Sequence, residues 1–445
     1  MVKEGERHTV TVENWASDGS GVARIDGLAV FVKGGIAGET CAVEIEHVGH
    51  SAAWAHITEL LSPAPGRIVP DCPHFGTCGG CQLRHMTYET ELAFKRQKVS
   101  DALRRIGGLD AEVPPVLGAA DRSHYRNKAQ FPVGPGPRVG FYRERSHQVV
   151  DVDNCALQSP AANALAAALR GWMKEYNVPA YDEKSRKGLV RHLFVRSNAA
   201  GESLAAVVVN GKALPFEAEL VETFRAATPS LVGVILNENR RDTNVILGDG
   251  WRTLWGESTL QDTLQGVAFR LSVPAFYQVN HAQTEVLYAL AEEFAALTGE
   301  ETLLDLYCGI GAIGLTMANK CKTLLGAEIV PAAIEDAKEN AAANGVTNAR
   351  FLCADASEVA SQLAQTGEVI DVAIVDPPRK GLSPQVVESL LKIAPNRIVY
   401  VSCDPATLAR DLKLLSAAYA VKKVQSVDLF PRTFHVETVV KLERK

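Results

Sequence analysis

The sequence has no apolar run that approaches the roughly twenty residues needed to cross a bilayer. Its first ten residues, MVKEGERHTV, have no apolar core of the kind found in secretory signal peptides. It also has no internal repeats and no low-complexity tail. These absences argue against a membrane protein and a secreted protein. They predict a cytoplasmic protein whose thiols stay reduced.

Excess positive charge is also missing, because the formal net charge is -6. An acidic balance argues against a protein that coats nucleic acid indiscriminately. The charge is uneven, however, since residues 121–200 carry thirteen Lys and Arg against seven Asp and Glu. This stretch is either a face that contacts phosphates or an ordinary solvated surface.

The 445 residues suggest two to four domains. Residues 8–60 contain four or five short strands with alternating or β-branched residues and glycine turns, which predicts a small barrel of the OB type. The Pro-rich stretch SPAPGRIVPDCP then indicates a boundary. Further on, YETELAFKRQKVSDALRRIG and PAANALAAALRGWMKEY predict helices. Several strands accompany them up to residue 270, which indicates an α+β unit.

From about residue 276 the pattern alternates between apolar strands and helices, which predicts a parallel, doubly wound sheet. The predicted fold is therefore a multidomain chain of β and α/β units. The expected divisions are an N-terminal OB-like β-barrel over 1–62, an α+β central domain over 63–270 and a Rossmann-like C-terminal domain over 271–445.

Cysteine, in contrast, is concentrated in one short stretch, CPHFGTCGGC, which holds Cys72, Cys78 and Cys81. Three thiols cannot pair off, and clustered cysteines in a reducing compartment are more often metal ligands or catalytic groups than disulfides. A metal centre usually needs a fourth ligand, which this stretch alone does not supply. Unliganded cysteines are the alternative.

A glycine-rich turn follows an apolar strand in LLDLYCGIGAIG, with Gly309, Gly311 and Gly314 at the spacing G-x-G-x-x-G. By itself this turn fits a dinucleotide, S-adenosylmethionine, or no ligand. Asp305 precedes it, and Glu328 ends the next strand, where a carboxylate can accept both ribose hydroxyls.

Asp376 begins the stretch DPPR after the apolar run VIDVAIV, at the edge where open α/β sheets bind ligands. A D-P-P motif at this edge is typical of methyltransferases that act on a planar nitrogen or carbon. A helix N-cap before a proline turn is the alternative interpretation of Asp376.

Cys403 lies just past another apolar strand, where the helix ATLARD begins. Most lone cysteines are small buried hydrophobes. A helix N-terminus favours the thiolate, however, and predicts a nucleophile here. Beside a methyl donor this suggests addition to carbon-6 of uracil, which turns carbon-5 into a nucleophile. A base must then remove the carbon-5 proton. Glu437 in LFPRTFHVETVVKL is the preferred base, and His435 is the alternative.

With these residues the sequence resembles the RNA uracil-C5 methyltransferases, and most closely the bacterial enzymes that make 5-methyluridine in 23S ribosomal RNA. The resemblance covers nearly the whole chain. Its first sixty residues resemble the RNA-binding TRAM module, and CPHFGTCGGC resembles the iron–sulfur motif of that family. Five further motifs follow in order, namely AFYQVN, DLYCGIG, DPPRKG, SCDPATLARD and FPRTFHVE.

The resemblance implies roles for individual residues. It makes Cys403 the nucleophile and Glu437 the base, with Arg379 and Asp404 beside them to orient the base. The residues that it assigns to the S-adenosylmethionine and uracil pocket are Gln278, Tyr307, Glu328 and Asp376. It supplies Cys155 as the fourth thiolate beside Cys72, Cys78 and Cys81. Four thiolates suit a [4Fe–4S] cluster or a structural zinc, and the resemblance favours the cluster.

RNA is the partner that the resemblance implies, with 23S ribosomal RNA preferred, and nothing indicates a membrane, DNA or an obligate protein partner. Transfer RNA is the alternative substrate. A non-catalytic RNA-binding or assembly factor and an NAD-dependent oxidoreductase are alternatives from other classes. The candidates for phosphate contacts are Arg122, Arg126, Lys128, Arg143, Arg191 and Arg196, with His124 and Tyr125 as candidates for base stacking.

Overall fold

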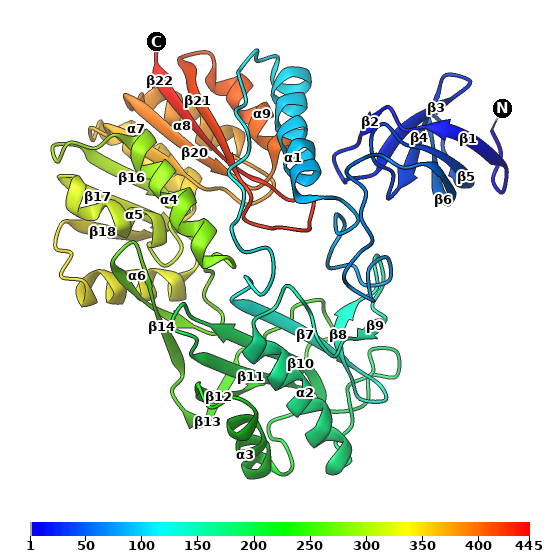
Figure 1. Ribbon diagram of the computed structural model, residues 1–445. Helices are drawn as coiled ribbons and strands as arrows, with labels where there is room; N and C mark the ends of the chain where they lie inside the picture. The colour runs from blue at the N-terminus through cyan, green and yellow to red at the C-terminus, as the bar shows by residue number, and fades with distance from the viewer. Residues whose placement is uncertain (1) are drawn as a thin grey trace.

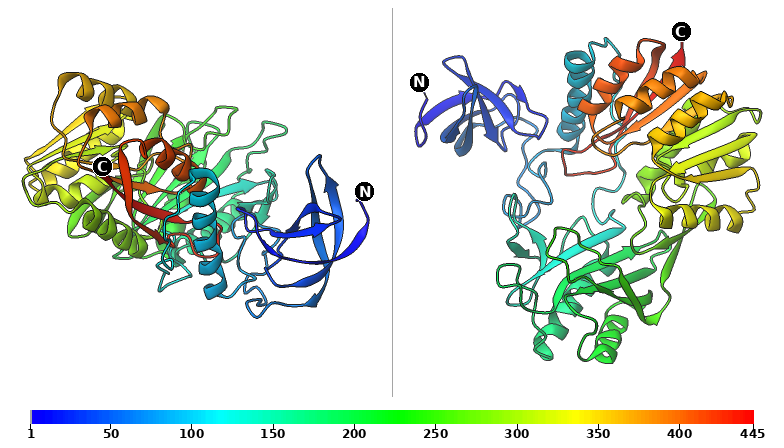
Figure 2. Two further views of the ribbon diagram at one scale, coloured as in Figure 1. Left: turned by 90° about the horizontal axis from the view of Figure 1, so that it is seen from above. Right: turned by 180° about the vertical axis from the view of Figure 1, so that it is seen from behind.

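The computed structural model describes residues 2–445 and divides them into three sheet-based units (Figure 1). None of the helices in this range is both long and apolar enough to cross a membrane. The N-terminal barrel stands to one side of the molecule, next to helix α1, while the central and C-terminal units face each other (Figures 1 and 2). The expected multidomain arrangement of β and α/β units is therefore confirmed.

The N-terminal unit is a six-stranded sheet with the order β1-β5-β6-β4-β3-β2. Its strands are Arg7–Thr11, Asn14–Trp15, Gly21–Ile25, Leu28–Lys33, Thr40–Val48 and Ala52–Ser62. Alternate side chains of these strands, among them Val30, Val32, Val43 and Ile45, form a small apolar core. All pairings are antiparallel except that of β4 with β6. The predicted small barrel is thus present.

The central unit is a seven-stranded mixed sheet with the order β13-β12-β11-β10-β7-β8-β9. Its strands are β7 (Lys128–Gly134), β8 (Arg138–Tyr142), β9 (Val149–Asp151), β10 (Val190–Ser197), β11 (Ser203–Val209), β12 (Leu231–Glu238) and β13 (Gly250–Gly256). Helices α2 (Pro160–Glu175) and α3 (Glu217–Ala227) cover one face. Helix α2 begins at the N-cap Ser159, whose side chain accepts from the backbone N–H of Ala162.

The C-terminal unit is a seven-stranded sheet with the order β18-β17-β16-β19-β20-β22-β21. Five strands are parallel, namely β16 (Thr302–Leu306), β17 (Thr323–Glu328), β18 (Ala349–Cys353), β19 (Val372–Val375) and β20 (Arg397–Ser402). β22 (Glu437–Arg444) runs antiparallel to β20, and β21 (Tyr419–Val427) closes the edge. The predicted doubly wound sheet is present.

Helices cover both faces of this sheet, as its continuous apolar strands require. One face carries α4 (His281–Ala295), α5 (Ala312–Met317), which runs into the short turn η2 (Ala318–Lys320), and α6 (Pro331–Ala343). The other carries α7 (Ala356–Thr366), α8 (Pro384–Ile393) and α9 (Pro405–Leu415).

The packing crosses the expected domain boundaries at two places. Helix α1 (Tyr88–Ala102) and the π-turn η1 (Leu103–Gly107) belong to the predicted central domain but pack on α9 and the C-terminal core. The hairpin of β14 (Thr259–Leu264) and β15 (Val267–Ser272) packs in the other C-terminal core cluster. The expected boundary at 270/271 falls inside β15, so the structural break lies before the hairpin.

Candidate active site

Residues from five strands meet at the carboxyl edge of the C-terminal sheet. Tyr307, Glu328, Asp376 and Cys403 lie at or just past the ends of β16, β17, β19 and β20. β22 runs the other way, so its first residue, Glu437, lies at the same edge. Ser402 pairs with Thr438, and the same register carried one residue further brings Cys403 opposite Glu437. The sheet therefore brings the predicted pocket residues to one edge and places the predicted nucleophile and base on neighbouring strands.

The glycine-rich turn forms the floor of this edge. Gly311 has a φ of 80°, which favours glycine. A Cβ on Gly314 would lie 2.8 Å from Asp305 Oδ2, which accepts from the Gly314 N–H at 2.9 Å. Burial raises the pKa of Asp305 to about 7, and its Oδ1 has no partner within residues 2–445. Asp305 thus ties the strand to the turn and leaves one acceptor free.

Glu328 accepts from the N–H of Gly309 at 3.2 Å and from the N–H of Val330 at 2.9 Å. These contacts fix its carboxylate beside the glycine-rich turn at the end of β17. A carboxylate held in this way can accept the two hydroxyls of a ribose, and the turn lets the backbone approach it closely. The residues present therefore fit the adenosine part of S-adenosylmethionine.

Two neighbouring carboxyl groups hold their protons unusually strongly. Burial raises the pKa of Asp376 to about 7. Burial and then the nearby Asp376 raise the pKa of Glu437 to about 8, against a weaker opposing effect of Arg379. No side-chain hydrogen bond fixes either carboxyl within residues 2–445. A carboxyl group with a pKa near the working pH suits a general base.

Burial favours the neutral thiol of Cys403 over the expected thiolate. Burial raises its pKa to about 12, and Glu437 and Asp376 add to the shift. At the N-terminus of α9, the N-cap Asp404 accepts from the N–H of Ala406 at 2.9 Å and of Thr407 at 3.0 Å. The thiol must therefore lose its proton as it reacts.

His435 is poorly suited to act as a base, which favours Glu437 over the alternative. Burial and the adjacent Arg379 lower the pKa of His435 to about 3. Arg379 Nη2 lies 3.2 Å from Nε2 of His435 and donates to it. Arg379 is thereby held over the site and also moderates the pKa of Glu437. The orienting roles of Arg379 and Asp404 stay predictions, and Asp404 caps α9.

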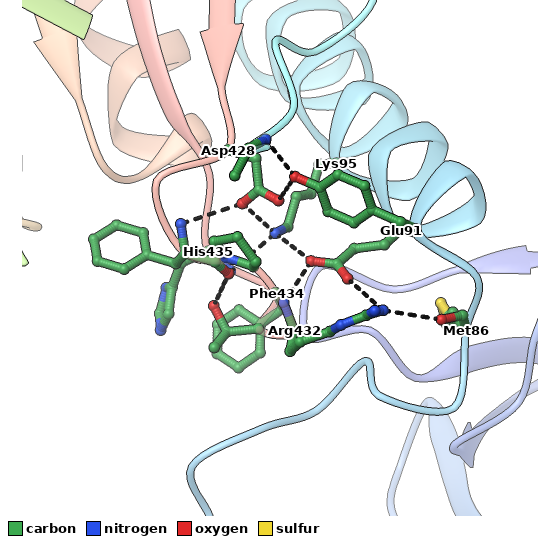
Figure 3. A network of polar contacts seen from close by, with 12 residues as sticks. Met86, Glu91, Lys95, Asp428, Arg432, Phe434 and His435 are labelled. Atoms are coloured by element: carbon green, nitrogen blue, oxygen red, sulfur yellow. Dashed lines mark hydrogen bonds and ion pairs between the residues drawn. The ribbon is translucent and has the colours of Figure 1, made fainter. Parts of the chain in front are cut away.

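A buried ionic network holds the loop that leads into Glu437 (Figure 3). Lys95 Nζ donates to Glu91 Oε1 at 2.7 Å and to Asp428 Oδ1 at 2.6 Å, and all three side chains are fully buried. It also donates to the carbonyl of Phe430 at 3.2 Å. The N–H of Arg432 donates to Glu91 at 2.7 Å. Helix α1 therefore fixes the loop 428–436, which we call the base loop.

The sequence pattern gave no sign of this network. Glu91 and Lys95 are four apart on a helix, a spacing typical of exposed ion pairs. Asp428 lies more than 300 residues away, so only the tertiary structure shows that the three charges meet. Tyr88 completes the arrangement, because its hydroxyl donates to Asp428 Oδ2 at 2.8 Å.

The four predicted cysteine ligands line one cavity of about 90 Å³, together with Arg84 and Arg126. The N–H of Gly80 points at Cys78 Sγ and Arg84 Nε at Cys81 Sγ, each at 3.4 Å. Burial raises the pKa of Cys81 to about 11. Across residues 2–445, no group of three or more His, Cys, Asp or Glu side chains is arranged to hold a metal ion. The four thiols are suitable metal ligands and line one cavity. In residues 2–445, however, their side chains are not placed as the ligands of a metal ion.

The cysteine-rich segment also contacts the base loop directly. The backbone N–H groups of Gln82 and Leu83 both donate to the carbonyl of Arg432 at 3.1 Å. Tyr125 donates its hydroxyl to the carbonyl of Pro431 at 3.0 Å. The cysteine-rich segment is far from Cys403 along the chain, but the fold brings it against the loop that leads into Glu437.

The other two predicted pocket residues occupy distinctive backbone positions. Tyr307 follows β16 with a φ of 68°, which is unusual for a residue other than glycine. Gln278 is buried in the loop before α4, and its carbonyl accepts from Asn127 Nδ2 at 2.9 Å. This bond joins the start of β7 in the central sheet to the C-terminal unit. The contacts that these side chains make with ligands stay predictions.

Several residues proposed for RNA contacts are buried and bind other parts of the protein. Arg196 is fully buried and donates to the carbonyls of Val273 and Ala275. Arg191 is buried as well, and its Nη1 donates to the carbonyls of Asn239 and Arg241 at 2.8 Å. Tyr125 is buried against the base loop and is not free to stack on a base.

The remaining candidates for RNA contacts are at least partly exposed to solvent. Arg122, Arg143 and His124 are exposed, and Arg126 and Lys128 are half-buried. Burial lowers the pKa of Lys128 to about 8. These side chains remain candidates for phosphate or base contacts.

The fold and this edge together define an S-adenosylmethionine-dependent methyltransferase, and the comparisons agree. A family model described as tRNA (Uracil-5-)-methyltransferase matches residues 255–445. The model of the TRAM domain matches residues 2–55. An uncharacterized RNA methyltransferase of Caldanaerobacter subterraneus subsp. tengcongensis is 42% identical, with 100% of this chain and 99% of that protein covered.

A second relative, an uncharacterized RNA methyltransferase of Halalkalibacterium halodurans, is 42% identical over 98% of this chain and 96% of its own length. Among solved structures, the Pyrococcus abyssi tRNA (uracil-54, C5)-methyltransferase in complex with S-adenosyl-L-homocysteine matches with a TM-score of 0.79. It is 28% identical, and 98% of this chain and 100% of that chain are covered. The chain belongs to the RNA uracil-5-methyltransferase family, with an N-terminal TRAM domain. It is an S-adenosylmethionine-dependent enzyme that acts on RNA.

Proposed function

We propose that the protein methylates carbon-5 of a uridine in 23S ribosomal RNA, with Cys403 as nucleophile and Glu437 as base. The observation that carries the mechanism is the register of β20 and β22, which brings Cys403 opposite Glu437 at the ligand-binding edge. Asp376 and Arg379 act electrostatically on both groups. This chemistry needs a thiol and a base that reach adjacent carbons of one planar target.

Glu328 and the glycine-rich turn would hold the adenosine part of S-adenosylmethionine, which supplies an electrophilic methyl group. Cys403 gives its proton to solvent, and Sγ forms a bond to carbon-6. The electron pair of the ring double bond moves toward carbon-5, which takes the methyl group from the sulfonium and leaves a neutral thioether. Glu437 then accepts the proton from carbon-5, and that electron pair restores the ring double bond and expels Sγ. The raised pKa of Cys403, about 12, makes its thiolate a strong nucleophile once formed.

The test uses S-adenosylmethionine labelled in the methyl group, with unmodified 23S RNA and unmodified transfer RNA as separate substrates. We expect label in 5-methyluridine of 23S RNA with the wild type and none with Cys403→Ala. Glu437→Gln should stop after methyl transfer and accumulate a covalent protein–RNA adduct that survives denaturing electrophoresis. Adduct formation by the double variant Cys403→Ala, Glu437→Gln would overturn the assignment of the nucleophile.

Transfer RNA is the second candidate substrate, and a specific comparison favours it. The matched Pyrococcus abyssi enzyme acts on uracil-54 of tRNA according to its description. Label in transfer RNA alone would keep the mechanism and replace the substrate. No label in either RNA would favour a non-catalytic RNA-binding factor built on the same fold.

We also propose that Cys72, Cys78, Cys81 and Cys155 hold a [4Fe–4S] cluster. All four line one cavity, and the N–H groups directed at two of the sulfurs suit cluster thiolates. Anaerobic purification should give about four iron atoms per chain and a broad absorption near 400 nm, both lost in Cys81→Ser. About one zinc atom with no visible absorption would favour the structural zinc instead.

A further inference from the structure

A second pocket, separate from the active site, opens on the central sheet. Its volume is about 610 Å³. The side chains that matter for its chemistry are Arg138, Tyr142, Tyr181, Lys184, Arg191 and His192. They come from β8, from β10 and from the loop before β10. Neither the family's motifs nor the proposed reaction uses these residues.

The pocket lies on the face of the central sheet that is directed toward the C-terminal unit. Successive residues of a strand point to opposite faces. Leu193 and Val195 of β10 pack in the core under α2 and α3, whereas Phe194 packs in the core that includes the β14–β15 hairpin. His192 shares the face of Phe194. On β8, Val139 packs under α2, so Tyr142 lies on the opposite face as well.

The same face leads toward the active site. Arg196 and Lys128, which pair across β10 and β7, continue the row that His192 and Phe194 begin. The Gln278 loop follows directly, because Asn127 next to Lys128 binds its backbone. At the other end, Lys33 of the TRAM domain forms an ion pair with Glu144 at 2.6 Å, beside the pocket. This face therefore connects the TRAM domain, the pocket and the Gln278 loop.

The polar groups of the pocket can bind a ligand whose edges carry hydrogen-bonding atoms. His192 is 7% exposed and Arg191 is 6% exposed. His192 Nδ1 and Arg191 Nε have no hydrogen-bond partner within residues 2–445. Buried polar groups without partners cost free energy unless a ligand or water satisfies them.

The aromatic groups of the pocket suit a flat ligand. Tyr142 and Tyr181 both line it, and Arg191 lies over the ring of Tyr181 at 4.5 Å. The acidic residues at its rim are already engaged. Glu183 binds His147 at 2.7 Å, and Asp182 accepts from the hydroxyl of Ser185 at 2.8 Å. Arg138 and Lys184 are therefore left at the rim as cations that can meet phosphates.

We propose that this pocket receives a nucleobase extruded from the substrate RNA, away from the target uridine. Tyr142 and Tyr181 supply stacking surfaces, and the unpartnered Arg191 and His192 nitrogens meet the base edge. Because arginine only donates hydrogen bonds, the pocket favours a base with carbonyl acceptors, guanine or uracil. The proposal rests on RNA as substrate and does not depend on which RNA is methylated.

The first test is photo-crosslinking of the full-length protein, without S-adenosylmethionine. Unmodified 23S RNA and transfer RNA are transcribed with either 4-thiouridine or 6-thioguanosine. After digestion, we expect a nucleotide adduct on the peptide Val139–Arg143 or on the peptide that contains Tyr181. Adducts on TRAM peptides with none on these two, for both transcripts, would overturn the proposal. No methyl transfer is needed, so the result is independent of the proposed reaction.

The second test compares Tyr142→Ala with a matched control, Tyr176→Ala. Tyr176 is also half-buried and stacked, with its ring 4.7 Å from Phe216, but it follows α2 on the opposite face. Loss of one stacked base should weaken RNA binding by roughly five-fold to 100-fold in Tyr142→Ala. KM for RNA should rise while kcat stays close to wild type. Tyr142→Phe keeps the stacking ring and should bind like the wild type.

Circular dichroism and the melting temperature check that each variant is folded. Equal RNA affinity for Tyr142→Ala and Tyr176→Ala would overturn the proposal. Equilibrium dialysis with guanosine monophosphate and uridine monophosphate tests whether the pocket binds a base of RNA or a free nucleotide. Tight binding of a free mononucleotide that Tyr142→Ala abolishes, with RNA affinity unchanged, would assign the pocket to a free nucleotide and also overturn the proposal.

Discussion

At the scale of single residues, burial in the active site favours the protonated, uncharged forms of the reacting groups. Cys403, Asp376 and Glu437 all have raised pKa values, and burial is the first cause for each. The carboxyl groups also raise the pKa of the thiol. The site is therefore close to neutral before substrate binds, and ionisation accompanies the reaction.

The pH dependence of the rate follows from Glu437. Its pKa is about 8, and only the ionised form can accept the carbon-5 proton. Because Cys403 must also lose its proton, we expect kcat/KM to rise with pH more steeply below this value than above it. Methylation rates measured from pH 6 to 9.5 test this. Because the neighbouring groups titrate together, the apparent pKa belongs to the cluster. A flat profile between pH 6 and 8 would contradict Glu437 as the base.

The stability of the fold should also depend on the ionisation of Glu437. It should fall as pH rises, whereas the methylation rate should rise. The pKa of Glu437 is about 8 in the folded state against 4.5 for an ordinary glutamate. Between these values the folded protein binds more protons than the unfolded one, so its free energy of unfolding falls as pH rises. Glu437→Gln removes this contribution.

Calorimetry at pH 5 and pH 8 measures the effect. We expect Glu437→Gln to raise the melting temperature relative to wild type more at pH 8 than at pH 5. Glu443→Gln, on the same strand but partly exposed, is the control. An equal change in melting temperature for both variants at both pH values would show that burial does not destabilise the ionised form of Glu437.

At the scale of elements, helix α1 determines where the base loop lies. The helix begins at the N-cap Thr87, just after the cysteine-rich segment, and packs on α9. Its buried Glu91 and Lys95 bind Asp428 and the backbone of the base loop. The cysteine-rich segment and the base loop are therefore connected by helix α1 and by the two bonds from Gln82 and Leu83.

Lys95→Met tests this coupling. The substitution leaves Glu91 and Asp428 buried without their cation, which typically costs about 3–5 kcal/mol. We expect a lower melting temperature, measured by calorimetry, and a lower kcat for the folded protein at low temperature, with little change in KM for S-adenosylmethionine.

The matched control for Lys95→Met is Lys392→Met. Lys392 forms the same i,i+4 pair with Glu388 on α8, but there both side chains are exposed. Loss of that pair should cost less than about 1 kcal/mol and leave kcat unchanged. If Lys95→Met destabilised the protein without lowering kcat, the network would support the fold but not the position of the base.

At the scale of the whole molecule, a second buried ion pair attaches the TRAM domain. The side chain of Glu39 is fully buried, and it accepts from Arg67 Nη2 at 2.6 Å and from the N–H of Ile36 at 2.8 Å. Although burial acts to raise the pKa of Glu39, these bonds hold it below 4.5. Arg67 lies in the Pro-rich stretch between the two units, so the pair fixes the barrel to the join.

Arg67→Met should loosen the TRAM domain. It leaves the Glu39 carboxyl buried without its cation, and the Pro-rich stretch 62–73 should become more sensitive to limited proteolysis. RNA affinity should fall while kcat is preserved, because the reacting groups lie in the C-terminal unit. Arg24→Met removes an exposed pair with Glu13 and is the control. Equal proteolysis of both variants would exclude a role for the buried pair in fixing the barrel.

Much of this architecture could be predicted from local pattern. Period-two alternation predicted the barrel, and apolar strands alternating with helices predicted the parallel sheet. Chain order also placed Asp376 and Cys403 at one edge, because parallel strands end on the same side. The protonation state of Cys403 could not be predicted, since it depends on burial and on the carboxyl groups that the fold brings near the sulfur.

The sequence by itself therefore determined the kinds of units and the chemistry at the sheet edge, because both depend on residues that are close in the chain or fixed by strand order. Only the tertiary structure decided that Lys95 meets Asp428, that Arg196 is buried and that the four cysteines share one cavity. Burial and long-range contact set the energy of a charge, and neither can be read from the spacing of residues along the chain.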